Sequence, residues 1–219
     1  MCSSDLDVGT SLLIFGLFAA MLYMSTQRTA YLVGSLALLA VGAIVAYLAF
    51  GHVRVRVENW LDPWADPLGR GLQPIQAWFA FGSGGIAGTG IGLGHPGEVP
   101  NATTDYMFST IGEELGLTGA IAVVAAFMLL VGTGFRIALQ SSRPFAKLFA
   151  AGLVTIIGLQ TFLIIGGVLR VIPLTGIVLP FASYGGSSLL ANFAIIALLV
   201  RMSDDNARVS AAPRTGAGP

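Results

Sequence analysis

The sequence predicts an all-α, polytopic membrane protein with about five transmembrane helices. Of its 219 residues, 55% are hydrophobic and only 10% are charged. This composition excludes the soluble globular, disordered and disulfide-scaffold classes. The apolar residues form long runs and lack the period-two alternation of a lipid-facing barrel. Helical spans are therefore the simplest interpretation, because a helix satisfies its own backbone polar groups in lipid.

Five stretches approach the roughly 20 apolar residues that a helix needs to cross about 30 Å of hydrocarbon. They are residues 9–25, 31–50, 117–139, 145–169 and 175–200, within a membrane domain of residues 7–201. Residues 202–219 are polar and predicted to be a disordered tail. Residues 1–6 read like a translated sequencing adapter, so we expect them to be non-native, with an ordinary short N-terminus as the alternative.

The positions of the basic residues indicate how the protein is oriented in the membrane. Arg28 lies between the first two spans, Arg143 and Lys147 lie at the third connection, and Arg201 and Arg208 lie in the tail. These positions favour the cytoplasm, so the C-terminus is expected there. The long loop, at about residues 51–116, is then extracytoplasmic, where seven acidic residues accompany three arginines. A loop of this length in a compact membrane domain is usually functional.

Arg54 and Arg56 open the loop within an Arg-Val-Arg-Val run. In an extended chain this alternation places both guanidiniums on one side, where they are candidate ligands for phosphate oxygens. The equally weighted alternative is that they anchor a helix end at the headgroup layer, beside Trp60 and Trp64.

A short apolar and aromatic stretch over residues 73–81 cannot span the bilayer and predicts an interfacial or re-entrant helix beginning at Pro74. We expect this helix to form the floor of a groove at membrane level, with Gln73 as a candidate substrate-binding residue. The glycine-rich stretch 82–97 matches a dinucleotide fingerprint only by chance, because no strand precedes it. It is predicted to be a flexible, close-packed loop.

Acidic residues gather at 105–114. If the chain is helical from about Asp105, Glu113 lies within about 80° of Asp105 and Glu114 lies opposite. A partly desolvated carboxylate here can act as a general base. The alternative is that these acids are solvated partners of a helix N-terminus. On the first interpretation Asp105 is a candidate catalytic residue and Glu113 a candidate substrate-binding residue, whereas the spacing by itself favours the second interpretation.

The last span is interrupted by the stretch 180–188, Pro-Phe-Ala-Ser-Tyr-Gly-Gly-Ser-Ser. Such small and hydroxylated residues allow close helix contacts or a broken helix that lines a polar cavity. Ser187 is a candidate substrate-binding residue on the second interpretation. Packing alone is the commoner explanation.

Four ordered motifs resemble the SEDS family of cell-wall polymerases, the group of RodA, FtsW and SpoVE. The motifs are Asp-Val-Gly-Thr at 7–10, Trp-Leu-Asp-Pro-Trp-Ala-Asp-Pro at 60–67, Thr-Asp-Tyr-Met-Phe with Gly-Glu-Glu-Leu-Gly at 104–116, and Leu-Pro-Phe-Ala-Ser-Tyr-Gly-Gly-Ser-Ser at 179–188. The resemblance implies that this chain corresponds to spans six to ten of a ten-span fold. Since that fold builds its cavity from both halves, we expect the 219-residue polypeptide alone to be inactive.

The resemblance further implies a peptidoglycan glycosyltransferase that polymerises lipid II at the outer face of the bacterial cytoplasmic membrane, with a class B penicillin-binding protein as its partner. Asp105 takes the position of the family's essential loop aspartate and would deprotonate the acceptor hydroxyl. Arg54 and Arg56 would stabilise the undecaprenyl pyrophosphate, with a divalent cation, Mg²⁺ or Mn²⁺, as the candidate cofactor. Thr103 stands where the family commonly has histidine.

Within the family, the tail and the glycine-rich loop slightly favour a RodA-like role in elongation over an FtsW-like role in division. Two other classes remain open, a transporter (flippase) of lipid-linked precursor and a non-catalytic scaffold. The spans are almost free of ionisable residues while the acids crowd one face, which disfavours the transporter. The scattered basic residues give no indication of a nucleic-acid partner.

Overall fold

The computed structural model describes residues 8–95, 97, 99–100 and 102–211. Across these residues all regular structure is helical, as predicted. The elements are α1 (Val8–Thr26), α2 (Thr29–Ala49), α3 (Gly51–Leu61), the 3₁₀ turn η1 (Pro63–Ala65), α4 (Leu72–Gly84), α5 (Met107–Gln140), α6 (Pro144–Val168) and α7 (Gly186–Ala211). The predicted non-native stretch 1–6 lies outside the described residues.

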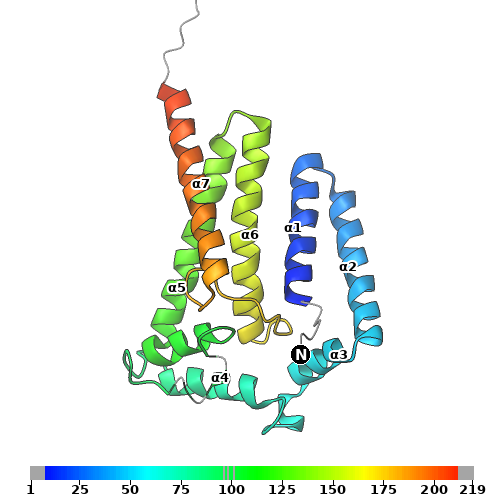
Figure 1. Ribbon diagram of the computed structural model, residues 1–219, viewed down its shortest axis with the longest axis vertical. Helices are drawn as coiled ribbons and strands as arrows, with labels where there is room; N and C mark the ends of the chain where they lie inside the picture. The colour runs from blue at the N-terminus through cyan, green and yellow to red at the C-terminus, as the bar shows by residue number, and fades with distance from the viewer. Residues whose placement is uncertain (1–7, 96, 98, 101, 212–219) are drawn as a thin grey trace, which may run out of the picture.

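Five helices, α1, α2, α5, α6 and α7, are long and apolar enough to cross a membrane, which confirms the predicted number of spans. In Figure 1 they run side by side, with the 27–28 and 141–143 connections at one end and α3 and α4 at the other. The short helix predicted at 73–81 is α4, which begins at Leu72 and ends at Gly84. The long loop therefore gathers at one end of the bundle.

The centre of the bundle is α6, which contacts α5, α1 and α7. More than half of its apolar window is buried (56%), whereas α2 has no buried residue at all. Small residues allow the close approach, since Ala150 is fully buried and a Cβ at Gly134 would lie 2.3 Å from Val154. The exposed apolar surface of α2 thus faces away from this helical core.

Glycine 116 divides α5 into two parts. Its φ of 66° and ψ of −167° break the helix between a first segment from Met107 and the span that follows. A Cβ at this glycine would lie 2.4 Å from Gly88 N, so only glycine permits both the positive φ and the close approach of the loop. The predicted start of the span, Leu117, coincides with this break.

The run around Arg54 and Arg56 is helical, which corrects the extended geometry considered from the sequence. An extended chain at the membrane boundary leaves its backbone groups unpaired, whereas α3 pairs them, and Val53 N and Arg54 N donate to Phe50 O at 3.1 and 3.2 Å. At about 100° per residue, residues two apart point in nearly opposite directions. The two guanidiniums therefore do not share a face.

The last span begins at Gly186 and not at Thr175. Residues 169–185 are apolar in part but irregular, because Pro173 and Pro180 each remove a backbone donor and Gly176 has a φ of 74°. This segment is fixed by α6, whose buried Gln160 donates from Nε2 to Val178 O at 3.0 Å. The broken-helix interpretation of this region is closer to the structure than continuous helix.

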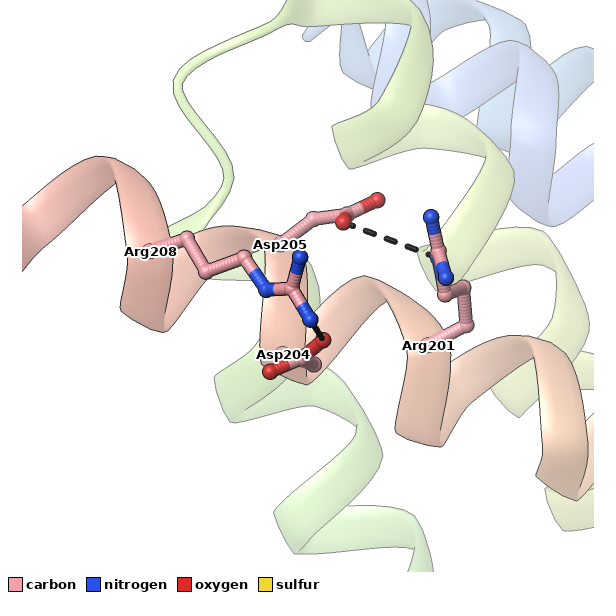
Figure 2. A network of polar contacts seen from close by, with 4 residues as sticks. All are labelled: Arg201, Asp204, Asp205 and Arg208. Atoms are coloured by element: carbon pink, nitrogen blue, oxygen red, sulfur yellow. Dashed lines mark ion pairs between the residues drawn. The ribbon is translucent and has the colours of Figure 1, made fainter.

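The prediction of a disordered tail from residue 202 is wrong as far as Ala211, where α7 remains helical. Asn206 Nδ2 donates to Ile137 O on α5 at 3.0 Å, which ties the helix to the bundle. Figure 2 shows two exposed i,i+4 ion pairs, Arg201–Asp205 at 3.6 Å and Arg208–Asp204 at 2.8 Å. Each such pair adds about 0.3–0.5 kcal/mol of helix stability. Residues 212–219 lie outside the described part.

Candidate active site

A cleft opens at the loop end of the bundle, between α3, α4, the turn before α5 and the segment after α6. Its space amounts to about 720 Å³, open solvent included. Its lining combines one carboxylate, two guanidiniums, two amides, two indoles and one phenol with apolar side chains and two glycines. The polar members are Arg56, Asn59, Trp60, Gln73, Trp78, Asp105, Tyr106 and Arg170.

Asp105 lies in a turn immediately before α5, which begins at Met107 rather than at the expected Asp105. The irregular segment after α6 holds this turn. Ser183 Oγ donates to Thr104 O at 2.6 Å, and Tyr184 N donates to Thr103 O at 2.8 Å. The small-residue motif of the last predicted span is therefore a backbone support for Asp105 and does not itself line the cleft.

Burial raises the pKa of the Asp105 carboxyl above its ordinary value of 3.8, because the charged form loses solvation. A hydrogen bond from Thr104 and the charge of Arg56 oppose this rise without cancelling it. A carboxylate with a raised pKa holds a proton more strongly than an exposed aspartate. It is therefore a better general base for a hydroxyl group.

The neighbouring phenol of Tyr106 stays protonated. Its pKa is raised by burial and by the negative charge of Asp105, and its side chain is only 3% exposed. A neutral hydroxyl next to the carboxylate can donate a hydrogen bond into the cleft.

Arg56 comes from the side of α3 that faces the segment after α6. Its Nη1 donates to Thr175 O at 3.0 Å and to Leu174 O at 3.5 Å. A Cβ placed at Gly176 would lie 3.7 Å from Nη2, an ordinary contact distance, so the φ of 74°, and not the space beside the guanidinium, favours glycine at this position. An arginine has five N–H donors, so several remain for an anionic ligand.

Arg170 lies across the cleft and was not identified from the sequence. Its guanidinium donates to the backbone carbonyls of Trp60, at 2.8 Å, and of Leu61. The same group lies 5.0 Å from the centre of the Trp78 ring, within cation–π range. The available signal was a cation at the end of an apolar span on the loop side. The folding of α3 and α4 over it could not be read from the sequence.

The structure brings together three of the residues predicted to form the site, Asp105, Arg56 and Gln73. Arg54 points elsewhere, because its Nη2 donates to Leu48 O at 3.4 Å and its guanidinium lies 5.5 Å from the Tyr47 ring centre. The pairing of Arg54 with Arg56 at one site is therefore wrong.

Two other predicted residues also lie outside this cleft. Ser187 is exposed in the first turn of α7. Glu113 lines a different cleft with Gln76 and Ser83. This corrects the expectation that Glu113 and Asp105 lie on the same side. The break between the Asp105 turn and α5 explains the difference, since the predicted 80° angle assumed one continuous helix.

Metal ligands are scarce in this region. Among residues 8–95, 97, 99–100 and 102–211 no three His, Cys, Asp or Glu side chains gather as a metal site would require. The cleft does not offer a divalent cation the cluster of carboxylates that it prefers. The cationic groups that this cleft does offer are Arg56 and Arg170.

The chain belongs to the cell cycle protein family of FtsW, RodA and SpoVE, whose sequence profile matches residues 2–208. It is 48% identical over 197 residues to "Peptidoglycan glycosyltransferase RodA" of Mycobacterium tuberculosis, covering 90% of this chain and 42% of that protein. It is 39% identical over 199 residues to "Probable peptidoglycan glycosyltransferase FtsW" of Geobacter metallireducens, covering 90% and 53%. The chain thus spans about half the length of these relatives.

The fold is also similar to a solved structure described as "Structural coordination of polymerization and crosslinking by a peptidoglycan synthase complex". The TM-score is 0.76 and the sequence identity 29%, over 92% of this chain and 57% of the other. Together with the five apolar helices, the family membership makes this a multi-pass bacterial inner-membrane protein.

Proposed function

We propose that this chain forms the catalytic part of a peptidoglycan glycosyltransferase that polymerises lipid II. The single observation that carries the proposal is a partly buried carboxylate, Asp105, in a cleft that also presents Arg56 and Arg170. A glycosyl transfer from a diphosphate-linked donor needs these two chemistries side by side, a base for the acceptor and cations for the leaving group. The names of the relatives support the same reaction.

In the reaction, the Asp105 carboxylate takes the proton of the acceptor sugar's 4-hydroxyl as that oxygen attacks the anomeric carbon of the donor. A new glycosidic C–O bond forms, and the bond from the anomeric carbon to the diphosphate oxygen breaks. The electron pair leaves with the undecaprenyl diphosphate, whose negative charge Arg56 stabilises from α3. Gln73, at the start of α4, can hold sugar hydroxyls at the rim of the cleft.

The proposal also covers the side of the membrane on which the reaction occurs and the partner protein. The cleft faces the outside of the cell, because Arg28, Arg143 and Lys147 lie at the opposite end of the bundle. A class B penicillin-binding protein supplies the crosslinking step, in line with the description of the similar synthase complex. The higher identity to the RodA relative, 48% against 39%, supports a role in elongation.

The test uses the chain completed at its N-terminus with the preceding part of the mycobacterial relative and reconstituted with the penicillin-binding protein. We expect the parent to polymerise lipid II and Asp105→Asn, which keeps the shape but not the base, to form no polymer above background. Equal polymer from both proteins would remove Asp105 from the reaction. Movement of lipid II across vesicles by a parent that makes no polymer would instead indicate a transporter.

A further inference from the structure

Two contacts join α3 to the segment that follows α6, and they lie one helical turn apart. At the first, Arg56 Nη1 donates to Thr175 O at 3.0 Å. At the second, Trp60 Nε1 donates to Arg170 O at 3.0 Å. Because residues four apart share a helix face, both contacts belong to one edge of α3. This edge sets how the helix is rotated about its axis.

Arg170 strengthens the second contact from its own side. While its carbonyl accepts from the Trp60 indole, its Nε donates to Trp60 O at 2.8 Å and its Nη2 donates to Leu61 O. These carbonyls belong to the last turn of α3, where no intrahelical donor remains for them. A cation at a helix C-terminus also interacts favourably with the helix dipole.

The backbone of Arg170 is held in a conformation that an arginine rarely adopts. Its φ is +63°, in the left-handed region, where the Cβ lies too close to the following carbonyl oxygen. Such a conformation persists where surrounding contacts determine it, and here the contacts to Trp60, Leu61 and Trp78 do so. The side chain therefore links α3, α4 and the segment after α6, which are three walls of the cleft.

We propose that Arg170 is a positioning residue of the transfer site. By fixing the carboxyl end of α3 against the 170–176 segment, it sets the rotation of that helix and keeps the Arg56 guanidinium beside Asp105. The inference rests on the proposed function, since it assigns Arg170 an effect on the same reaction. Without this contact, Arg56 would lose its alignment although none of its own bonds is removed.

Because Arg170 has a left-handed φ, it can be replaced by glycine without straining the backbone. Arg170→Gly removes the side chain and relieves the backbone, because glycine adopts φ +63° without strain. Arg170→Lys keeps the charge but loses the planar fork that reaches two carbonyls. Trp60→Phe keeps one aromatic ring and removes the second, with the indole N–H that donates to Arg170. Arg54→Ala is the matched control, an arginine on the same helix that points away from the cleft.

The measurement is kcat/KM for lipid II polymerisation against pH, with the completed chain and its partner. We expect Arg170→Gly, Arg170→Lys and Trp60→Phe each to lower it about tenfold or more, since misplacement by about 1 Å can reduce a rate about a hundredfold. The acid limb should also move to higher pH, as in Arg56→Ala, because the charge of Arg56 lowers the pKa of Asp105. Arg54→Ala should match the parent in both respects.

A double-mutant cycle shows whether Arg170 acts through Arg56. The Arg56→Ala/Arg170→Gly protein should be no less active than Arg56→Ala, since residues that act together give non-additive effects. The inference would be overturned if the losses in kcat/KM of the two single variants added up in the double variant. It would also be overturned if Arg170→Gly, Arg170→Lys and Trp60→Phe all kept the acid limb of the parent, or if they reacted at the rate of the parent. If Asp105→Asn polymerises normally, the proposed function fails, whereas parent-like Arg170 variants beside an inactive Asp105→Asn refute the positioning role alone.

Discussion

Asp105 and Glu113 line different clefts, on opposite flanks of α4. The Asp105 cleft includes Gln73 and Trp78, whereas the Glu113 cleft includes Gln76 and Ser83. At about 100° per residue these pairs fall on separate sides of the α4 helix. Two acids close in sequence therefore face different surroundings, and of the two only Asp105 lines the cleft with Arg56 and Arg170.

Glu113 anchors the glycine-rich loop. Its Oε1 accepts from His95 N at 2.9 Å, its backbone carbonyl accepts from Thr89 N at 2.9 Å, and the side chain is only 4% exposed. We predict that Glu113→Ala destabilises the fold by about 1–3 kcal/mol, because the part-buried hydrogen bond from His95 N to this carboxylate is lost. The measurement is thermal unfolding in detergent, with limited proteolysis to detect opening of residues 85–95.

Glu113→Gln is the matched variant for this prediction. Its amide oxygen can still accept from His95 N, so the melting temperature and the protease resistance of the loop should stay close to those of the parent. A Glu113→Gln protein as unstable as Glu113→Ala would show that the charge, and not the hydrogen bond, holds the loop.

Hydropathy was sufficient to predict the five spans and α4, because the length of an apolar run directly reflects bilayer thickness. The incorrect predictions arose where one sequence pattern fits two backbone conformations. The Arg-Val alternation before Trp60 fits an extended chain as well as a helix end, and only backbone pairing in α3 decides between them. Likewise Arg170 and Ser183 act through backbone carbonyls distant in sequence, and no side-chain pattern predicts such partners.

The raised pKa of Asp105 predicts the pH dependence of polymerisation. A general base must be ionised, so kcat/KM should fall as the pH drops through the pKa of this carboxyl. Because burial raises that pKa above 3.8, the fall should begin at a higher pH than for an exposed aspartate. The rate profile of the completed chain checks this. A rate that stays constant down to pH 4 would contradict the assignment.

The raised pKa of Asp105 also predicts that its ionised carboxylate destabilises the folded protein. For a carboxyl whose folded pKa is raised, stability is greatest below the unfolded pKa, about 3.9, and is lost as the pH rises through the folded value. Asp105→Asn removes this loss, so its melting temperature should exceed the parent's at pH 7 and approach it near pH 4. A neutral-pH melting temperature below the parent's would show that the Asp105 charge stabilises the turn.

Close packing of α4 on α5 predicts sensitivity at Gly84. A Cβ there would lie 2.1 Å from Gly112 O, which the backbone of α5 cannot avoid without moving. We expect Gly84→Ala to destabilise the protein by about 1–3 kcal/mol through overpacking. Gly42→Ala on α2, where no atom lies within 4 Å, is the control and should be neutral or stabilising by up to about 1 kcal/mol. Equal melting temperatures for the two variants would mean that α4 is free to shift.

The orientation of the bundle can be tested by labelling single cysteines in whole cells. With Cys2 replaced by serine, Leu68→Cys places a thiol at a side chain that is 87% exposed at the α3–α4 end. Ser142→Cys places one in the exposed α5–α6 connection at the other end. Since cytoplasmic connections carry the excess of lysine and arginine, a membrane-impermeant maleimide should label Leu68→Cys in intact cells and Ser142→Cys only after lysis. The reverse pattern would place the Asp105 cleft in the cytoplasm, where the proposed polymerisation at the outer face could not occur.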